Sequence, residues 1–160
     1  MQELSEVSDM EVIEETGKVN FASIIDLLKE EWPKDWGTIS DEKMIEDFEK
    51  TANDQFDVNK YLSDNGKIIG WYRYSAWPRE KDNIENAHTF DIVIDPNYQG
   101  RGLGKMMMED MILDCKKKGF KKLMSRTIEG NHQSYRLHEK TGFKMAFRKG
   151  IDIVWEIDLL

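Results

Sequence analysis

The sequence is poor in cysteine and has no long apolar segment. A single cysteine, Cys115, excludes an internal disulfide and is typical of a reducing compartment, where it would serve core packing. No stretch approaches the roughly 18 uninterrupted apolar residues of a membrane span, and the acidic N-terminus lacks the layout of an export signal. There is also no repeat, low-complexity tract or linker. We therefore expect a cytoplasmic protein that does not enter a membrane.

Positive charge is also in short supply. Lys and Arg number 23 against 31 Asp and Glu, which gives a formal net charge of −8. Repulsion from phosphates argues against nucleic acid as a partner, and the balance mildly favours a cationic substrate, although acidic surfaces usually serve only solubility. A chain of 160 residues is long enough for one substantial core and short for two ordinary domains. We expect a single domain over residues 1–160.

Hydrophobic periodicity predicts helices early in the chain, followed by strands with two inserted helices. The predicted helices cover residues 20–32, 40–48, 102–118 and 131–140. The predicted strands cover residues 10–15 at a sheet edge, 58–62, 67–77, 88–94, 122–127, 143–147 and 151–159. This order indicates a mixed α/β, α+β-like fold with a mostly antiparallel sheet.

The junction between the strand at 88–94 and the next helix is rich in glycine. Three glycines alternate there: Gly100, Gly102 and Gly104. The first N–H groups of a helix are unpaired and carry a partial positive charge, and glycines let the backbone approach a ligand closely. Arg101 and Lys105 add positive charge. The stretch therefore favours binding of a phosphate group over a plain tight turn.

Two common phosphate motifs do not fit this stretch. A dinucleotide-binding fingerprint requires a third glycine where this sequence has Lys105, and it belongs to a first βαβ unit. A P-loop requires Ser or Thr after Gly-Lys, whereas Met106 follows Lys105.

Two segments of the sequence resemble a known family. Val93–Gly104, VIDPNYQGRGLG, resembles the Gln/Arg-x-x-Gly-x-Gly/Ala coenzyme A signature of the GNAT superfamily of acyl-CoA-dependent N-acetyltransferases, and Asn131–Phe143, NHQSYRLHEKTGF, is similar to its second motif. The order of elements matches over residues 20–159. The resemblance implies a GNAT-type fold, with a mostly antiparallel twisted sheet of six to seven strands and about four helices. It also implies a splay between the strands at 88–94 and 122–127.

The resemblance further implies that acetyl-CoA binds as a co-substrate and that no metal is needed. The amides around Gln99 would hold the pyrophosphate, Ile92–Ile94 would pair with the pantetheine arm, and Asn131 would contact the arm. Ile92–Ile94 is also a buried strand by pattern, and Asn131 also suits a helix N-cap. The expected coenzyme-binding residues are Ile92, Val93, Ile94, Gln99, Gly100, Arg101, Gly102, Leu103, Gly104, Lys105, Asn131 and Ser134.

Acetyl transfer requires a base for the amine and an acid for the departing thiolate. His138 stands where many relatives have a Tyr, and an imidazole near sulfur can act as the acid. His88 and Asp91 are candidates for the base, with a water chain as a rival. Strand alternation places His88 and Asp91 on opposite faces unless a bulge intervenes. The histidines lack the spacing of a metal site.

The acceptor is the part of the site that the sequence defines least. The expected substrate is an amine-bearing small molecule or peptide, attacked directly in a ternary complex. Trp32 and Trp36 would border its site, whereas the aromatic residues at 71–77 are expected to be core more than pocket. The alternatives are a non-catalytic acyl-CoA sensor of the same fold and a different nucleotide-binding fold. The acyl length and the oligomeric state stay open, with a homodimer as one option.

Overall fold

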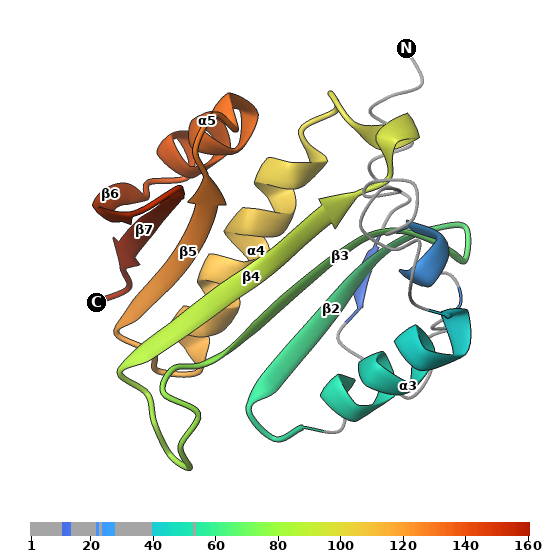
Figure 1. Ribbon diagram of the computed structural model, residues 1–160, viewed down its shortest axis with the longest axis horizontal. Helices are drawn as coiled ribbons and strands as arrows, with labels where there is room; N and C mark the ends of the chain where they lie inside the picture. Colours follow the sequence, from blue (N-terminus) through green and yellow to red (C-terminus); the bar gives the residue numbers. More distant parts are fainter. Residues whose placement is uncertain (1–10, 14–21, 23, 28–39, 53) are drawn as a thin grey trace. The chain divides into compact units, whose positions relative to one another are not determined.

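Seven strands form one sheet in the order β1-β2-β3-β4-β5-β7-β6 (Figure 1). The computed structural model describes residues 11–13, 22, 24–27, 40–52 and 54–160, of which 11–13, 51, 52, 90 and 91 are described by their backbone alone. The strands are β1 (Glu11–Ile13), β2 (Asp57–Asp64), β3 (Lys67–Ala76), β4 (Asn86–Ile94), β5 (Lys122–Ile128), β6 (Lys144–Lys149) and β7 (Asp152–Asp158). The helices are α3 (Asp41–Ala52), α4 (Leu103–Lys117), α5 (His132–Lys140) and the short 3-10 helix η1 (Pro96–Tyr98).

The strand pairing confirms the expected fold class. β1 pairs antiparallel with β2, β5 with β7 and β6 with β7, whereas β4 pairs parallel with β5. β1 lies at the sheet edge, as its pattern predicts. Residues 22 and 24–27 of the first predicted helix are helical, and the rest of that helix lies outside the described residues. None of the described helices is long and apolar enough to cross a membrane.

A tight turn joins β2 to β3, where the sequence predicts a hairpin. Asn65 and Gly66 both have positive φ, 50° and 83°. Positive φ at both central residues is typical of the two-residue turns whose twist matches that of the flanking strands, and Asn-Gly is the pair that adopts it at least cost. The turn therefore fixes the register of β2 against β3.

The chain divides into two compact units. The first consists of Met1–Arg73 and Asp91–Leu103, and the second of Tyr74–Phe90 and Gly104–Leu160. β3 and β4 each run through both units.

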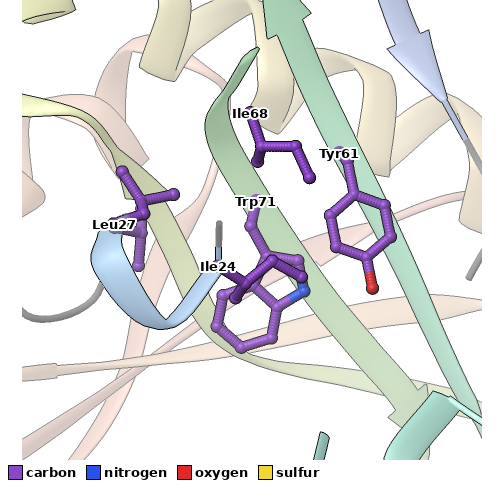
Figure 2. Close-up of a cluster of buried hydrophobic side chains, with 6 residues drawn as sticks. Ile24, Leu27, Tyr61, Ile68 and Trp71 are labelled. Atoms are coloured by element: carbon purple, nitrogen blue, oxygen red, sulfur yellow. The ribbon is translucent and has the colours of Figure 1, made fainter. Parts of the chain in front are cut away.

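An aromatic and aliphatic cluster forms the core of the first unit (Figure 2). Its members come from the early helical segment, β2, β3 and β4: Ile24, Leu27, Tyr61, Ile68, Trp71 and Val93. Trp71 is its largest side chain. The indole Nε1–H donates to Asn59 Oδ1 at 3.0 Å, and the ring of Phe48 from α3 meets the indole edge-on with centroids 5.2 Å apart. The polar end of a buried Trp is thus satisfied within the core.

α4 contributes an apolar stripe to the second unit. Met107, Met111 and Cys115 are fully buried, which confirms the predicted four-residue ladder and the core role of the cysteine. Near the C-terminus of the helix, the Tyr74 hydroxyl from β3 donates to Asp114, and Lys118 Nζ lies 3.0 Å from the same carboxylate. The buried Tyr74 and the half-buried Asp114 thus join β3 to α4.

β4 carries one more residue than the facing part of β3. The Trp77 N–H donates to the Asn86 carbonyl at 2.8 Å, and the Asp95 N–H donates to the Ile69 carbonyl at 2.7 Å. Between these bonds the chain advances eight residues on one side (69 to 77) and nine on the other (86 to 95). One extra residue in one strand of an antiparallel pair is a β-bulge. The alternation of side chains between the two faces of the sheet is therefore interrupted within β4.

The Trp71–Asn59 bond provides a test of the core. Trp71→Phe removes the indole donor and leaves the Asn59 oxygen buried without it, so the free energy of unfolding should fall by about 1–3 kcal/mol. Trp77→Phe is the matched control, because Trp77 is 49% exposed and the change there should stay within about 0.5 kcal/mol. Urea unfolding of both variants measures the difference, and equal losses would contradict this account of the core.

Candidate functional site

A buried carboxylate fixes the point where the chain leaves β4. Asp95 is 2% exposed, and its Oδ1 accepts from the Asn97 N–H at 2.9 Å as the N-cap of η1. Lys67 Nζ lies 3.5 Å from Oδ2 and supplies the countercharge. Pro96 occupies the first turn, where its missing N–H costs nothing. Asp95 therefore holds the start of the glycine loop.

Two side chains order the loop itself. Gln99 Nε2 donates to the Ile94 carbonyl at 3.1 Å, so this side chain ties the loop back to the end of β4. The Tyr98 hydroxyl donates to Asp64 Oδ2 at 2.7 Å, and that bond raises the pKa of Tyr98. The Arg101 guanidinium lies 5.0 Å from the centroid of the Tyr98 ring, in cation–π contact. Arg101 is exposed, so its charge faces solvent beside the loop.

The three glycines of the loop differ in whether their backbone conformation requires glycine. Gly100 and Gly102 have φ of 80° and 81°, which L side chains rarely adopt, so both serve the turn. Gly104 has no positive φ and lies in the first turn of α4. A Cβ added there would meet Leu137 Cδ2 at 3.9 Å, an ordinary contact. Among the described residues, nothing requires a glycine at Gly104.

The start of α4 can bind an anion. The N–H groups of its first residues, Leu103, Gly104 and Lys105, have no partner within the helix, and the helix dipole adds partial positive charge. Lys105 Nζ lies 3.8 Å from Glu109 Oε1 on the exposed surface, where such a pair contributes little. The loop and helix start therefore offer N–H donors and two cationic side chains, Arg101 and Lys105.

Asn131 and Ser134 begin α5. The Asn131 side chain accepts from the Ser134 N–H at 3.2 Å, which confirms the expected N-cap role. The Ser134 carbonyl lies 2.7 Å from His138 Nδ1, one turn further along the helix. The helix start is thus linked through Ser134 to the histidine.

His138 is buried and both of its ring nitrogens are bonded. Nδ1 lies 2.7 Å from the Ser134 carbonyl, and Nε2 lies 2.7 Å from Ser125 Oγ on β5. The ring stacks on Trp155 with centroids 5.3 Å apart and meets Phe143 edge-on at 5.1 Å. At 3% exposure the imidazole is held in one orientation by packing and by both bonds.

These bonds define the protonation state of His138. A carbonyl can only accept, so Nδ1 carries the proton, and Nε2 then accepts from the Ser125 hydroxyl. Burial lowers the pKa of His138 from its ordinary value of 6.5, and the Ser134 bond opposes this in part. The resting imidazole is therefore neutral and offers a lone pair rather than a proton at Nε2.

His88 lies on β4 opposite Met124 of β5. It is half-buried, and its pKa is lowered first by burial and then by the nearby Arg126 charge, with a bond to Thr89 backbone acting in the other direction. Its ring lies 6.3 Å from that of Trp77. A neutral imidazole suits a base. The backbone of Asp91 lies in β4, but its side chain is outside the described part of the structure.

The structure places the two candidate histidines on opposite faces of the sheet in the second unit. Ser125, which contacts His138, pairs with Thr89, and both side chains are buried. Successive residues of a strand point to opposite faces, so His88 faces away from Thr89 and Ser125. His88 and His138 therefore do not form a pair.

Sequence reasoning missed Ser125 and Asp95. A polar residue at an inward position of a predicted strand, and an Asp before Pro at a strand end, are the signals that mark them. The expected acceptor residues Trp32 and Trp36 lie outside the described residues. Of the aromatic residues at 71–77, Trp71, Tyr72 and Tyr74 are core as predicted, whereas Trp77 is 49% exposed. Within the described residues no group of three or more His, Cys, Asp or Glu could hold a metal.

The sequence matches a known family over most of its length. Residues 21–143 match the Acetyltransferase (GNAT) family. The chain belongs to this family. The [ribosomal protein bS18]-alanine N-acetyltransferase of Escherichia coli K12 is 30% identical over 89 residues, which are 56% of this chain and 56% of that protein. A glucosamine 6-phosphate N-acetyltransferase of Trypanosoma brucei brucei is 29% identical over 85 residues, 52% of this chain and 56% of that protein. This GNAT chain thus spans about half the length of the curated relatives it matches.

The fold is that of solved GNAT structures. The PaiA N-acetyltransferase of Thermoplasma acidophilum, solved in complex with coenzyme A, superposes with a TM-score of 0.72 at 19% identity, covering 93% of this chain and 98% of the other. At that identity the likeness concerns the fold. It confirms the GNAT-type architecture expected from the two sequence motifs.

The state of His138 is directly measurable. Long-range ¹H–¹⁵N spectra should show a neutral Nδ1–H tautomer that titrates below 6.5, because burial lowers its pKa. The unfolded chain then binds more protons between the two pKa values, so this residue stabilises folding above about 6.5 and loses that contribution as pH falls through the folded pKa. The urea-unfolded protein is the reference. A midpoint above 6.5 or a proton on Nε2 would contradict the assignment.

Proposed function

We propose that this GNAT protein is an N-acetyltransferase that moves an acetyl group from acetyl-CoA to a primary amine of a small molecule or peptide. The amine attacks the thioester directly in a ternary complex. The observation that carries the proposal is the glycine loop, which Asp95 and Gln99 tie to the end of β4 and which leads directly into the first turn of α4. A residue without Cβ at a helix start lets a phosphate approach the amides closely. Residues 1–160 would act as a single domain.

The residues proposed to hold the coenzyme are those of the glycine loop and its neighbours. The amides from Gln99 to Lys105, with Arg101, would bind the pyrophosphate. The backbone of Ile92–Ile94 would pair with the pantetheine arm, and Asn131 and Ser134 would contact that arm from α5. The coenzyme would supply the activated acetyl group. No metal is part of this proposal.

Proton transfer is proposed for the two histidines, with Asp91 as a third candidate. The lowered pKa of His88 leaves it neutral at physiological pH, as a base must be. His138 is also neutral at rest, so it reaches the acid state only after taking up a proton. A direct donor at Nε2, as the family resemblance suggests, would require an imidazolium that burial disfavours.

The acceptor class follows from the relatives and from charge. The similar proteins are named for a ribosomal-protein alanine and for an amino sugar phosphate, both of which carry amines. The net charge of −8 supports a cationic acceptor. The chain has a single cysteine, the buried Cys115, and one cysteine cannot form an internal disulfide, which supports the expected cytoplasmic location. A homodimer is compatible with this proposal.

Gly104→Val separates a ligand cradle from a structural turn, because the coenzyme A signature that the loop resembles allows Ala at this position but no larger side chain. Replacing this helical glycine by Val should change the free energy of unfolding by less than about 1 kcal/mol, because its φ is not positive and Val has a better helix propensity than Gly. The branched side chain should still weaken coenzyme A binding by about tenfold or more, because about 1.4 kcal/mol lost at the phosphates is tenfold. Calorimetry with coenzyme A and urea unfolding measure the two effects. Unchanged affinity would remove the main support for the coenzyme site.

Gly102 and Gly150 supply matched controls. Gly102→Ala should cost about 1 kcal/mol or more of stability, because φ is 81°, and should weaken coenzyme A binding as well. Gly150, with φ of 62° in the turn between β6 and β7, carries comparable backbone strain away from the loop. Gly150→Ala should therefore lower stability without changing the affinity for coenzyme A.

Thiol release from acetyl-CoA over a panel of amines tests the activity. Spermidine, an aminoglycoside, L-phenylalanine, glucosamine 6-phosphate and an alanine-initiated peptide cover the acceptor classes. Turnover on at least one amine is the expected result. Coenzyme A binding without turnover on any amine would favour a non-catalytic acyl-CoA sensor, and no binding would reject both.

A further inference from the structure

We propose that Ser125 and His138 form a two-residue proton relay that takes the proton from the attacking amine and returns it to the departing sulfur. This inference rests on the proposed acetyl transfer. It adds Ser125 to the site and gives His138 a role that its resting protonation state allows.

The geometry of the pair is that of an activated hydroxyl. Ser125 Oγ lies 2.7 Å from His138 Nε2, and His138 Nδ1 lies 2.7 Å from the Ser134 carbonyl. A hydroxyl bonded to an imidazole that a third group orients is the arrangement in which proteins withdraw the proton of a Ser, and a Ser that gives up its proton can take another. The Trp155 and Phe143 rings fix the imidazole plane, so the bond to Ser125 does not depend on solvent.

The direction of the bond decides which step comes first. Ser125 donates to Nε2, so its oxygen keeps lone pairs that can accept a further N–H. The imidazole contacts aromatic rings, a hydroxyl and a carbonyl. Burial is the main cause of its lowered pKa. A neutral imidazole in such surroundings is an acceptor first and a donor afterwards.

Ser125 also lies at a special place in the sheet. The described register of β4 against β5 runs from Asn86 opposite Lys122 to Thr89 opposite Ser125. β4 continues from there to Ile94, at about 3.3 Å per residue. A thioester seated where the described pairing of β4 with β5 ends, at Thr89, would lie beside Ser125. Ser125 is the described polar side chain of β5 at that level.

The transfer balances in atoms and charge. As the new C–N bond forms, Ser125 Oγ accepts the nitrogen proton, directly or through one bound water, while the Ser125 proton passes to His138 Nε2. The resulting imidazolium keeps its Nδ1–H on the Ser134 carbonyl. As the C–S bond breaks, His138 returns the proton to Ser125 Oγ, and the Ser125 proton passes to sulfur. The amine has lost one proton, the thiol has gained one, and both side chains are restored.

Ser125→Ala, tested on the fastest amine of the panel, removes the relay while keeping the imidazole. We expect kcat to fall about 100-fold, the range of a lost general acid–base group, with little change in the KM for acetyl-CoA. Thr127→Val is the matched control. Thr127 is buried on the same face of β5 and accepts from Trp155 Nε1 at 2.9 Å, so this variant also loses a buried hydroxyl bond. Its kcat should stay within about twofold of the wild type, because both bonds of the imidazole and its contact with Phe143 still hold His138 in place.

Three further readouts separate the relay from a structural role. Melting temperatures of the two variants should fall by similar amounts, about 2–4 °C. The His138 Nε2 resonance should shift in Ser125→Ala and stay in place in Thr127→Val. Because the pair acts as one unit, Ser125→Ala combined with His138→Phe should be no slower than the slower single variant. If Ser125→Ala does not fold, Ser125→Cys replaces it with the same expected direction.

The kinetic results for the variants test the relay separately from the proposed acetyl transfer. A Ser125→Ala enzyme as fast as Thr127→Val overturns the relay, and so do multiplied losses in the double variant, which would show independent roles. Neither result touches the acetyl transfer itself, which the wild-type turnover establishes separately. A wild-type protein that binds coenzyme A and acetylates no amine would reject the proposed function instead.

Discussion

The glycine loop of this protein depends on one buried carboxylate. Asp95 is out of contact with bulk water, and it remains there because a backbone N–H and the Lys67 ammonium compensate its charge. That compensation ends β4 at a defined residue and begins η1. The glycine loop and the first turn of α4 then follow at a fixed point of the chain. Without it, the N–H groups of the loop would have no defined orientation.

In the second unit, hydrogen bonds compensate the burial of a neutral polar group. His138 is buried among aromatic rings and keeps both nitrogens bonded, so burial costs little and one tautomer is selected. The Asn131 cap, the Ser134 backbone and the histidine form a continuous chain of bonds from the start of α5 to β5. A helix cap and a candidate catalytic group are thus parts of one polar network.

The fold and half of the site were predictable from local signals. The four-residue ladder of α4, the Asn65-Gly66 turn and the Asn131 cap each depend on residues close in sequence, and the structure confirms all three. The glycine loop was equally visible. The separate roles of the loop glycines could not be predicted. Gly102 and Gly104 differ in backbone φ and in the room for a Cβ, which at Gly104 depends on the distance to Leu137.

The sequence by itself determined the family, the order of the elements and the position of the glycine loop, because periodicity, caps and glycine motifs are properties of short segments. Only the tertiary structure decided that Ser125 meets His138 and that His88 faces the other side of the sheet. Those facts depend on strand register and on how α5 packs, and a shift of one residue in register would reverse them. Proton chemistry depends on such contacts between distant residues, which no local pattern encodes.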